Sequence, residues 1–163
     1  MDSHQFKEIP GKILRPVPIS MYQPFLQRIA KYIAEKHPNI FARLGEDVNK
    51  AFLIDPTNMP FVLLLEPDPN FVSLEAYRSA DGIDYDASIT GSFLNLLRLI
   101  DGELDGDALF FSRDLKVEGD TEAIVRLRNA MDDIDGSVAS DVADMFGPLG
   151  RAALARLRTF GQS

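Results

Sequence analysis

Residues 109–121, LFFSRDLKVEGDT, are the stretch that decides the fold of this chain. Apolar and charged side chains alternate over 115–118, which predicts a short strand. The Gly-Asp-Thr at 119–121 then predicts the start of a helix, with Asp120 as the N-cap. This helix is expected to bury one apolar stripe, made of Ile124, Leu127, Met131 and Ile134.

Three or four more strands are expected upstream, at 51–54, 61–65, 71–78 and 85–89. Clusters of Pro, Asn, Asp and Gly separate them, and their spacing is typical of an antiparallel meander. Alternating apolar and polar residues in the last of these strands predict a sheet with one buried and one solvated face. A helix that begins near 90–92 is expected to cover the buried face. Its apolar side consists of Phe93, Leu96, Leu97 and Ile100.

The two ends of the chain have different patterns. Four prolines within residues 10–24 predict an extended apolar arm, because proline disfavours helix at and before its own position. A helix is expected from Pro24 to the helix-ending His37, and a short one over 40–44 closed by Gly45. We therefore divide the chain into an arm, a domain and an amphipathic tail interrupted by a Gly-Pro pair, at 1–24, 25–136 and 137–163.

Composition excludes several classes of protein. The chain has 163 residues, enough for one domain, with a net charge of -8 that disfavours nucleic-acid binding. The absence of cysteine excludes disulfides, thiolate nucleophiles and iron-sulfur clusters, and it fits a reducing cytosol. The longest aliphatic run, 61–65, is too short to span a membrane, and residues 1–5 lack a signal-peptide core. We expect a soluble, cytoplasmic protein.

Candidate reactive groups are scarce. The only histidines are His4 and His37, and the sequence contains no nucleophile elbow, phosphate loop or dinucleotide-binding turn. The acidic loop from Asp101 matches the first positions of a calcium loop, but its twelfth position is Ser112 instead of Glu. We therefore expect neither a catalytic residue nor a metal site.

The charges are distributed unevenly along the chain. Residues 1–50 carry +3 and residues 145–163 carry +3, whereas 51–100 carry -5 and 101–144 carry -9. Basic ends and an acidic middle are compatible with a domain whose termini approach an anionic surface.

The motifs at 90–93 (TGSF), 101–104 (DGEL) and 108–121 (ALFFSRDLKVEGDT) together resemble the sterol carrier protein type two domain family. In that family a strand is followed by a helix, a short loop, a paired-Phe segment, a strand of the form Leu-x-Val/Ile-x-Gly-Asp/Asn and a long helix. All of these parts occur here in that order. Val17-Pro18-Ile19 in the arm and Asn129 after the motif make the chain similar to the bacterial accessory lipid-binding subfamily of oxygen-independent ubiquinone synthesis.

This resemblance implies an α+β fold, in which a five-stranded, mostly antiparallel sheet is covered by helices and encloses an apolar lipid tunnel. It implies no cofactor other than a lipid ligand, an isoprenoid quinone precursor or a phospholipid. The lipid-binding residues that it implies lie on the helix after the fourth strand, in the paired-Phe segment and in the tail: Phe93, Leu96, Leu97, Ile100, Phe110, Phe111, Met145 and Phe146.

The function implied is that of a non-enzymatic carrier that presents ubiquinone precursors, or phospholipid, to hydroxylating enzymes of the ubiquinone pathway. Such a carrier must visit a membrane, here the inner membrane, and basic side chains near anionic lipid favour that contact. The candidate docking residues are Lys31, Lys36, Arg151, Arg156 and Arg158.

Two other hypotheses about the function remain. One is an assembly scaffold whose apolar groove binds a partner protein, with any lipid being structural. The other is an enzyme that uses the carboxylates of Asp132, Asp133 and Asp135. A homodimer that joins two grooves is left open, as is whether the tail plugs or opens the tunnel.

Overall fold

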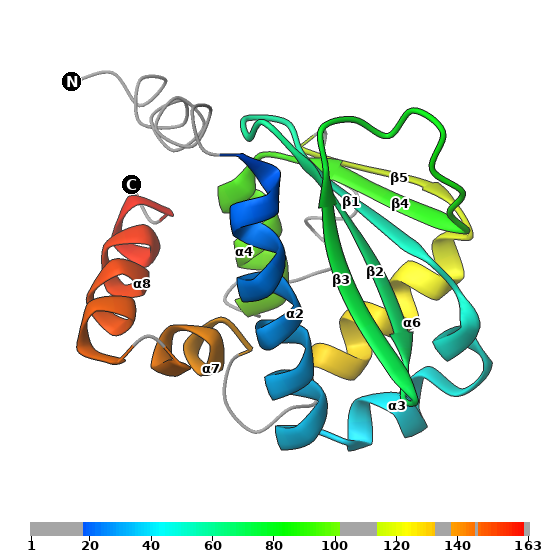
Figure 1. The fold of residues 1–163 in the computed structure, drawn as a ribbon, viewed down its shortest axis with the longest axis horizontal. Coiled ribbons are helices and arrows are strands. Elements are labelled where there is room, and N and C mark those ends of the chain that lie inside the picture. Colours follow the sequence, from blue (N-terminus) through cyan, green and yellow to red (C-terminus); the bar gives the residue numbers. More distant parts are fainter. Residues whose placement is uncertain (1–17, 102–113, 133–137, 146, 162–163) are drawn as a thin grey trace.

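The computed structural model describes residues 18–101, 114–132, 138–145 and 147–161 (Figure 1). Its helices are α2 (Ile19–Lys36), α3 (Asn39–Leu44), the 3-10 helix η1 (Gly45–Asn49), α4 (Phe93–Asp101), α6 (Thr121–Asp132), α7 (Val138–Met145) and α8 (Gly147–Gly161). Its strands are β1 (Phe52–Pro56), β2 (Val62–Asp68), β3 (Phe71–Tyr77), β4 (Ala87–Gly91) and β5 (Leu115–Gly119). The expected α+β class and all five expected strands are confirmed.

The strands form one mixed sheet in the order β3-β2-β1-β4-β5. Three of the neighbouring pairs are antiparallel, whereas β1 and β4 run parallel with Phe52 opposite Ala87 and Ile54 opposite Ile89. The sheet is thus mostly antiparallel, but the predicted meander is wrong at one step. After β3 the chain crosses to the far side of β1 instead of adding β4 beside β3.

Two glutamines of α2 occupy the edge of β3 that a meander would have used. Gln23 Nε2 donates to the Ala76 carbonyl at 2.8 Å, and the Ala76 N–H donates to Gln23 Oε1 at 3.1 Å. One turn later, Gln27 Nε2 donates to the Val72 carbonyl at 2.7 Å, and Gln27 Oε1 accepts from the Leu74 N–H at 3.4 Å. Free edges otherwise attract other strands, so these amides replace the missing neighbour.

Helix α2 begins at Ile19, so the extended conformation predicted for residues 19–24 is wrong. Pro18 is the N-cap, and Pro24 lies inside the helix, where it has no N–H to donate to the preceding turn. The additional first turn is supported by a tertiary contact, since the rings of Tyr22 and Phe61 lie 5.6 Å apart. The predicted helix end is confirmed, because His37 is the C-cap.

One face of the sheet, called here the inner face, packs against α4 and α6. Phe52 and Ala87 are fully buried there at 0% exposure. Burying a side chain such as Phe52 contributes about 1.5–3 kcal/mol relative to leaving it in water. The main core cluster consists of Phe52, Ala87, Ile89 and Leu115 from the sheet, Leu96 and Leu99 from α4, and Ala123 and Ile124 from α6.

The opposite face, called here the outer face, carries the alternate residues of each strand. Leu53 and Leu64 remain buried at its centre. Around them the side chains of Glu66, Glu75 and Glu118 are exposed. The outer face is therefore acidic and solvated only at its periphery. Its centre is buried, with Ser88 of β4 4% exposed, so the predicted fully solvated face is wrong there.

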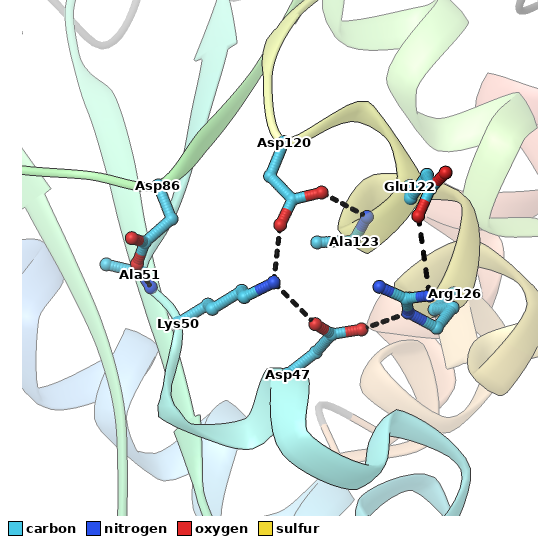
Figure 2. Close-up of polar contacts among 8 residues, drawn as sticks. All are labelled: Asp47, Lys50, Ala51, Asp86, Asp120, Glu122, Ala123 and Arg126. Carbon is cyan, nitrogen blue, oxygen red and sulfur yellow. Dashed lines mark hydrogen bonds and ion pairs between the residues drawn. The ribbon is translucent and has the colours of Figure 1, made fainter.

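Gly119 and Asp120 join the end of β5 to the start of α6 and to Asp86, which directly precedes β4. Figure 2 shows the side-chain contacts of Asp120. Gly119 has a φ of +76°, and a Cβ there would lie 2.4 Å from the Asp86 carbonyl oxygen, so glycine is required twice over. That carbonyl accepts a hydrogen bond from the Asp120 N–H at 2.9 Å. Asp120 Oδ1 accepts from the Ala123 N–H at 3.1 Å, which confirms the predicted N-cap of α6.

Asp47, in η1, supplies the buried charge of this junction, with 2% exposure. Its carboxylate accepts a hydrogen bond from Arg126 and lies 2.8 Å from Lys50 Nζ, and Lys50 also binds Asp120 (Figure 2). The bond from Arg126 lowers the pKa of Asp47; burial opposes this, and the bond from Lys50 adds to the lowering. The network joins the segment before β1 to the start of α6.

We expect Asp47→Asn to lower the free energy of unfolding by about 2 kcal/mol at pH 7, because the amide cannot pair with both cations. The pKa of Asp47 is lower in the folded state than in the unfolded state. Its contribution is therefore complete above the ordinary pKa and is lost as the pH falls through the lowered one. Urea unfolding across this range measures it. Glu46→Gln, at the exposed neighbouring position, is the control and should leave stability unchanged.

Candidate functional site

Helix α4 is apolar around most of its circumference and is covered on all sides. Six of the eight residues at 93–100 are Phe, Leu or Ile, and each of the eight is at least half-buried. The helix starts as the sequence predicts: Ser92 Oγ accepts from the Asn95 N–H at 3.2 Å, and Asn58 Oδ1 accepts from the Phe93 N–H at 2.8 Å. Figure 1 shows α4 between the sheet and the pair α7 and α8, both of which it contacts.

The four predicted residues of α4 point in two directions. Leu96 is 6% exposed and belongs to the core cluster with the sheet, together with Leu99, which was not predicted. Leu97 instead packs against Ala143 of α7. Phe93 and Ile100 are half-buried. Of the predicted set, Leu96 is therefore a core residue, whereas Leu97 faces the C-terminal helix α7.

The remaining predicted lining residues lie in or near the C-terminal segments. Met145 ends α7 and is half-buried. Phe110, Phe111 and Phe146 lie outside the described residues. A lipid-binding role for the predicted set, and the tunnel itself, stay predictions.

A buried carboxylate attaches α7 to α2. Asp141 is 8% exposed, and its two oxygens lie 2.6 Å from Lys36 Nζ and 2.5 Å from His37 Nε2. Burial by itself would raise the pKa of Asp141, but the hydrogen bonds from Lys36 and then His37 outweigh it, so the pKa is lowered. We call this three-residue contact the Asp141 clamp. It holds the helix that covers the outward side of α4.

Helix α8 contacts α7 and, to a smaller extent, α4. Leu149 is 83% exposed, and the side chains of Arg151 and Arg156 are exposed as well. Arg151 Nε lies 3.6 Å from Asp144 Oδ1 at the end of α7. An exposed apolar side chain beside two arginines is the combination that favours a membrane interface.

The five candidate docking residues do not form one set. Lys31 is exposed on α2, whereas Lys36 is engaged in the Asp141 clamp and lies 5.7 Å from the centre of the Tyr32 ring. Arg151 and Arg156 are exposed on α8, and the side chain of Arg158 is not among those described. Membrane docking by these residues stays a prediction.

No group of three or more His, Cys, Asp or Glu side chains within the described ranges could hold a metal ion. The side chains of the calcium-like loop, Asp101 to Ser112, and of Asp132, Asp133 and Asp135 lie outside what the structure describes. Within the same ranges, no helix has the length and apolar character of a membrane span.

Sequence reasoning missed Ala143, which packs on Leu97 of α4, and Asp141, which binds Lys36 and His37 at the end of α2. Ala143 is too small to stand out in an apolar stripe. Asp141 resembles any acidic residue in the first turn of a helix, where carboxylates are common. The His37-Asp141 pair joins residues 104 positions apart, so no local pattern could have shown it.

Comparison with known proteins agrees with this geometry. The profile described as the SCP-2 sterol transfer family matches residues 29–132. No curated protein matches the chain significantly. The solved structure titled "UbiJ-SCP2 Ubiquinone synthesis protein" is similar with a TM-score of 0.51 and 18% identity, covering 72% of this chain and 91% of its own. Sterol Carrier Protein 2 from Yarrowia lipolytica (apo form) aligns with a TM-score of 0.47 and 15% identity, covering 69% of this chain and 88% of its own.

We expect Asp141→Asn to loosen α7 without unfolding the sheet, because the amide loses both charge-assisted contacts. Hydrogen exchange should show residues 138–145 losing about tenfold protection while β1 and β4 keep theirs. The folded-state pKa of Asp141 is lowered, so the clamp is complete above the ordinary pKa and lost as the pH falls through the lowered value. Asp144→Asn, at an exposed position of the same helix, is the control; equal loosening by both variants would contradict the clamp.

Proposed function

Because the chain belongs to the SCP-2 sterol transfer family, we propose that it is a non-enzymatic carrier for lipids. The lipid tail lies against the side of α4 that now faces α7 and α8. The observation that carries this proposal is that α4 has apolar residues on two sides. Leu96 and Leu99 pack on the sheet, whereas Leu97 packs on a separate helix held by one polar clamp.

An apolar chain can replace α7 against α4 at small cost. A buried methylene gains about 0.8 kcal/mol relative to water, but a lipid begins in a bilayer that is already apolar. The free energy of the lipid in the carrier therefore has to be close to its free energy in the bilayer, and a comparison with water is not sufficient. A cover helix that gives way to the lipid keeps α4 shielded when the protein is empty, which lowers the cost of release.

For the ligand we propose an isoprenoid quinone precursor, presented to hydroxylating enzymes of the ubiquinone pathway. Two independent observations support this class of ligand. The sequence from Leu109 to Asp120 resembles the accessory subfamily of that pathway, and a structural neighbour is titled a ubiquinone synthesis protein. Phospholipid is the second ligand that the same apolar surface would accept.

We further propose that α8 and the exposed side of α2 touch the membrane when lipid is exchanged. Arg151 and Arg156 supply positive charge near anionic lipid, Leu149 supplies an insertable apolar side chain, and Lys31 adds charge from α2. Since α8 follows α7 directly, contact of α8 with a membrane would also pull on the Asp141 clamp.

Solvent extraction of the purified protein, followed by mass spectrometry, tests the carrier. We expect a stoichiometric polyprenylated phenol or quinone, or a phospholipid, and we expect Leu97→Arg to reduce its amount at least tenfold, because a cation would face the lipid tail. Val125→Arg places the same side chain on the exposed surface of α6 and is the control. A wild-type protein that contains no lipid, takes none from liposomes and co-purifies with a partner protein would favour the scaffold instead.

Flotation with vesicles that contain anionic phospholipid tests the docking surface. Two arginines contribute about 1 kcal/mol each near such a membrane, so Arg151→Glu with Arg156→Glu should weaken binding at least about thirtyfold. Reversing the charge of Arg78 and Lys116 to Glu is the matched control. Arg78 directly follows β3, Lys116 lies in β5, and both are exposed. Equal loss of binding in both double variants would show a net-charge effect and no docking surface.

A further inference from the structure

A hollow of about 290 Å3 lies at one end of the sheet, on the side away from α4. It is formed where η1 leads into β1 and where β2 turns into β3. Its lining includes Lys50, Glu66, Asp68, Phe71 and Asp86. Glu66 and Asp68 alternate with Leu65, which packs on the inner-face cluster, so their side chains stand on the outer face.

The charge of this hollow is negative. Three of its lining residues are carboxylates, and its only lysine points elsewhere: Lys50 binds Asp47 and Asp120 at the junction (Figure 2). Asp86 is oriented by the Ala51 N–H, which donates to its Oδ2 at 2.8 Å. Asp68 Oδ1 accepts from the Asn70 N–H at 2.9 Å, which holds that carboxylate at the turn.

The acidic character continues beyond the hollow. Glu75 and Glu118 are exposed on the same outer face, and Lys116, the cation of β5, lies 2.9 Å from Glu118. A surface of this kind repels phosphate groups, so it suits neither an anionic lipid headgroup nor a nucleic acid.

An aromatic ring stands at the rim. Phe71 begins β3 directly opposite Asp68 and is 83% exposed, the same fraction as Leu149 on α8. A ring that gains so little from packing within its own domain is free to contact a partner. The face of an aromatic ring attracts cations, most often the guanidinium of arginine.

We propose that this hollow binds an arginine side chain from a basic segment of a partner protein. The guanidinium stacks on Phe71 and pairs with the carboxylates of Glu66 and Asp68. The occupant follows from charge complementarity together with the exposed ring, because arginine is planar, permanently charged and able to donate to two carboxylates at once. The surface lies on the opposite face of the sheet from α4, so a protein partner and a lipid can be bound together.

Titration of the full-length protein with an amidated hexa-arginine peptide, followed by amide NMR, tests this site. We expect the largest shifts at residues 66–71 and 86, with binding weakened by 300 mM salt. Phe71→Ala should weaken binding about threefold, and Glu66→Gln with Asp68→Asn about tenfold. Glu66 and Phe71 are exposed and Asp68 is partly exposed, so these variants should fold. Unchanged spectra in the rest of the protein will verify that they do.

The control variant is Glu35→Gln, which removes an exposed carboxylate from α2, away from the hollow. It should bind the peptide as wild type does. The proposal is overturned if peptide shifts spread evenly over the exposed acids, or if Glu35→Gln weakens binding as much as the hollow variants do. It is also overturned if the signals of 66–71 move with protein concentration alone, since the occupant would then be a second copy. Loss of lipid binding would leave this result unaffected, so the two proposals fail separately.

Discussion

The close approach of Gly119 to Asp86, with Asp120 directly after it, organises the centre of the sheet and the start of α6. Only glycine brings the end of β5 against the Asp86 carbonyl, and Asp120 then caps α6 and holds Lys50. Lys50 in turn pairs with buried Asp47, which also binds Arg126 of α6. Through these contacts the starts of β1, β4 and α6 are fixed together, and the parallel pairing of β1 with β4 becomes the centre of the sheet.

The central position of β1 and β4 determines what happens to the two faces. α6 and α4 pack on the inner face, so α4 uses Leu96 and Leu99 for the core and leaves Leu97 for α7. The outer face receives no helix from the described residues and carries the carboxylates and Phe71. One sheet thereby separates an apolar side, where we propose that the lipid tail lies, from an anionic side, where we propose that a cationic protein segment binds.

The C-terminal helices differ in how firmly they are held. α7 is attached by an apolar contact at Ala143 and by the Asp141 clamp, which joins it to the end of α2. α8 exposes Leu149 and its arginines. Segments with few buried contacts open at the lowest free energy, and here they lie over the helix that is proposed to meet the ligand. Because α7 is attached partly by the Asp141 clamp, we expect its opening to depend on charge as well.

Period-two and period-3.6 patterns and capping residues act over a few positions, so they were sufficient to predict the five strands, the N-cap Asp120, the C-cap His37 and the apolar side of α4. The sequence by itself also carried the family resemblance, since that rests on short motifs that follow one another in a fixed order. Only the tertiary structure decided that β4 crosses to β1, that Gln23 and Gln27 bind the edge of β3, and that α2 begins before Pro24. Leu96 of α4 packs on the sheet and Leu97 packs on α7, and His37 pairs with Asp141. These contacts depend on which distant segments meet. Such contacts are fixed by packing and by hydrogen-bond partners far away in the chain, and no local pattern encodes them.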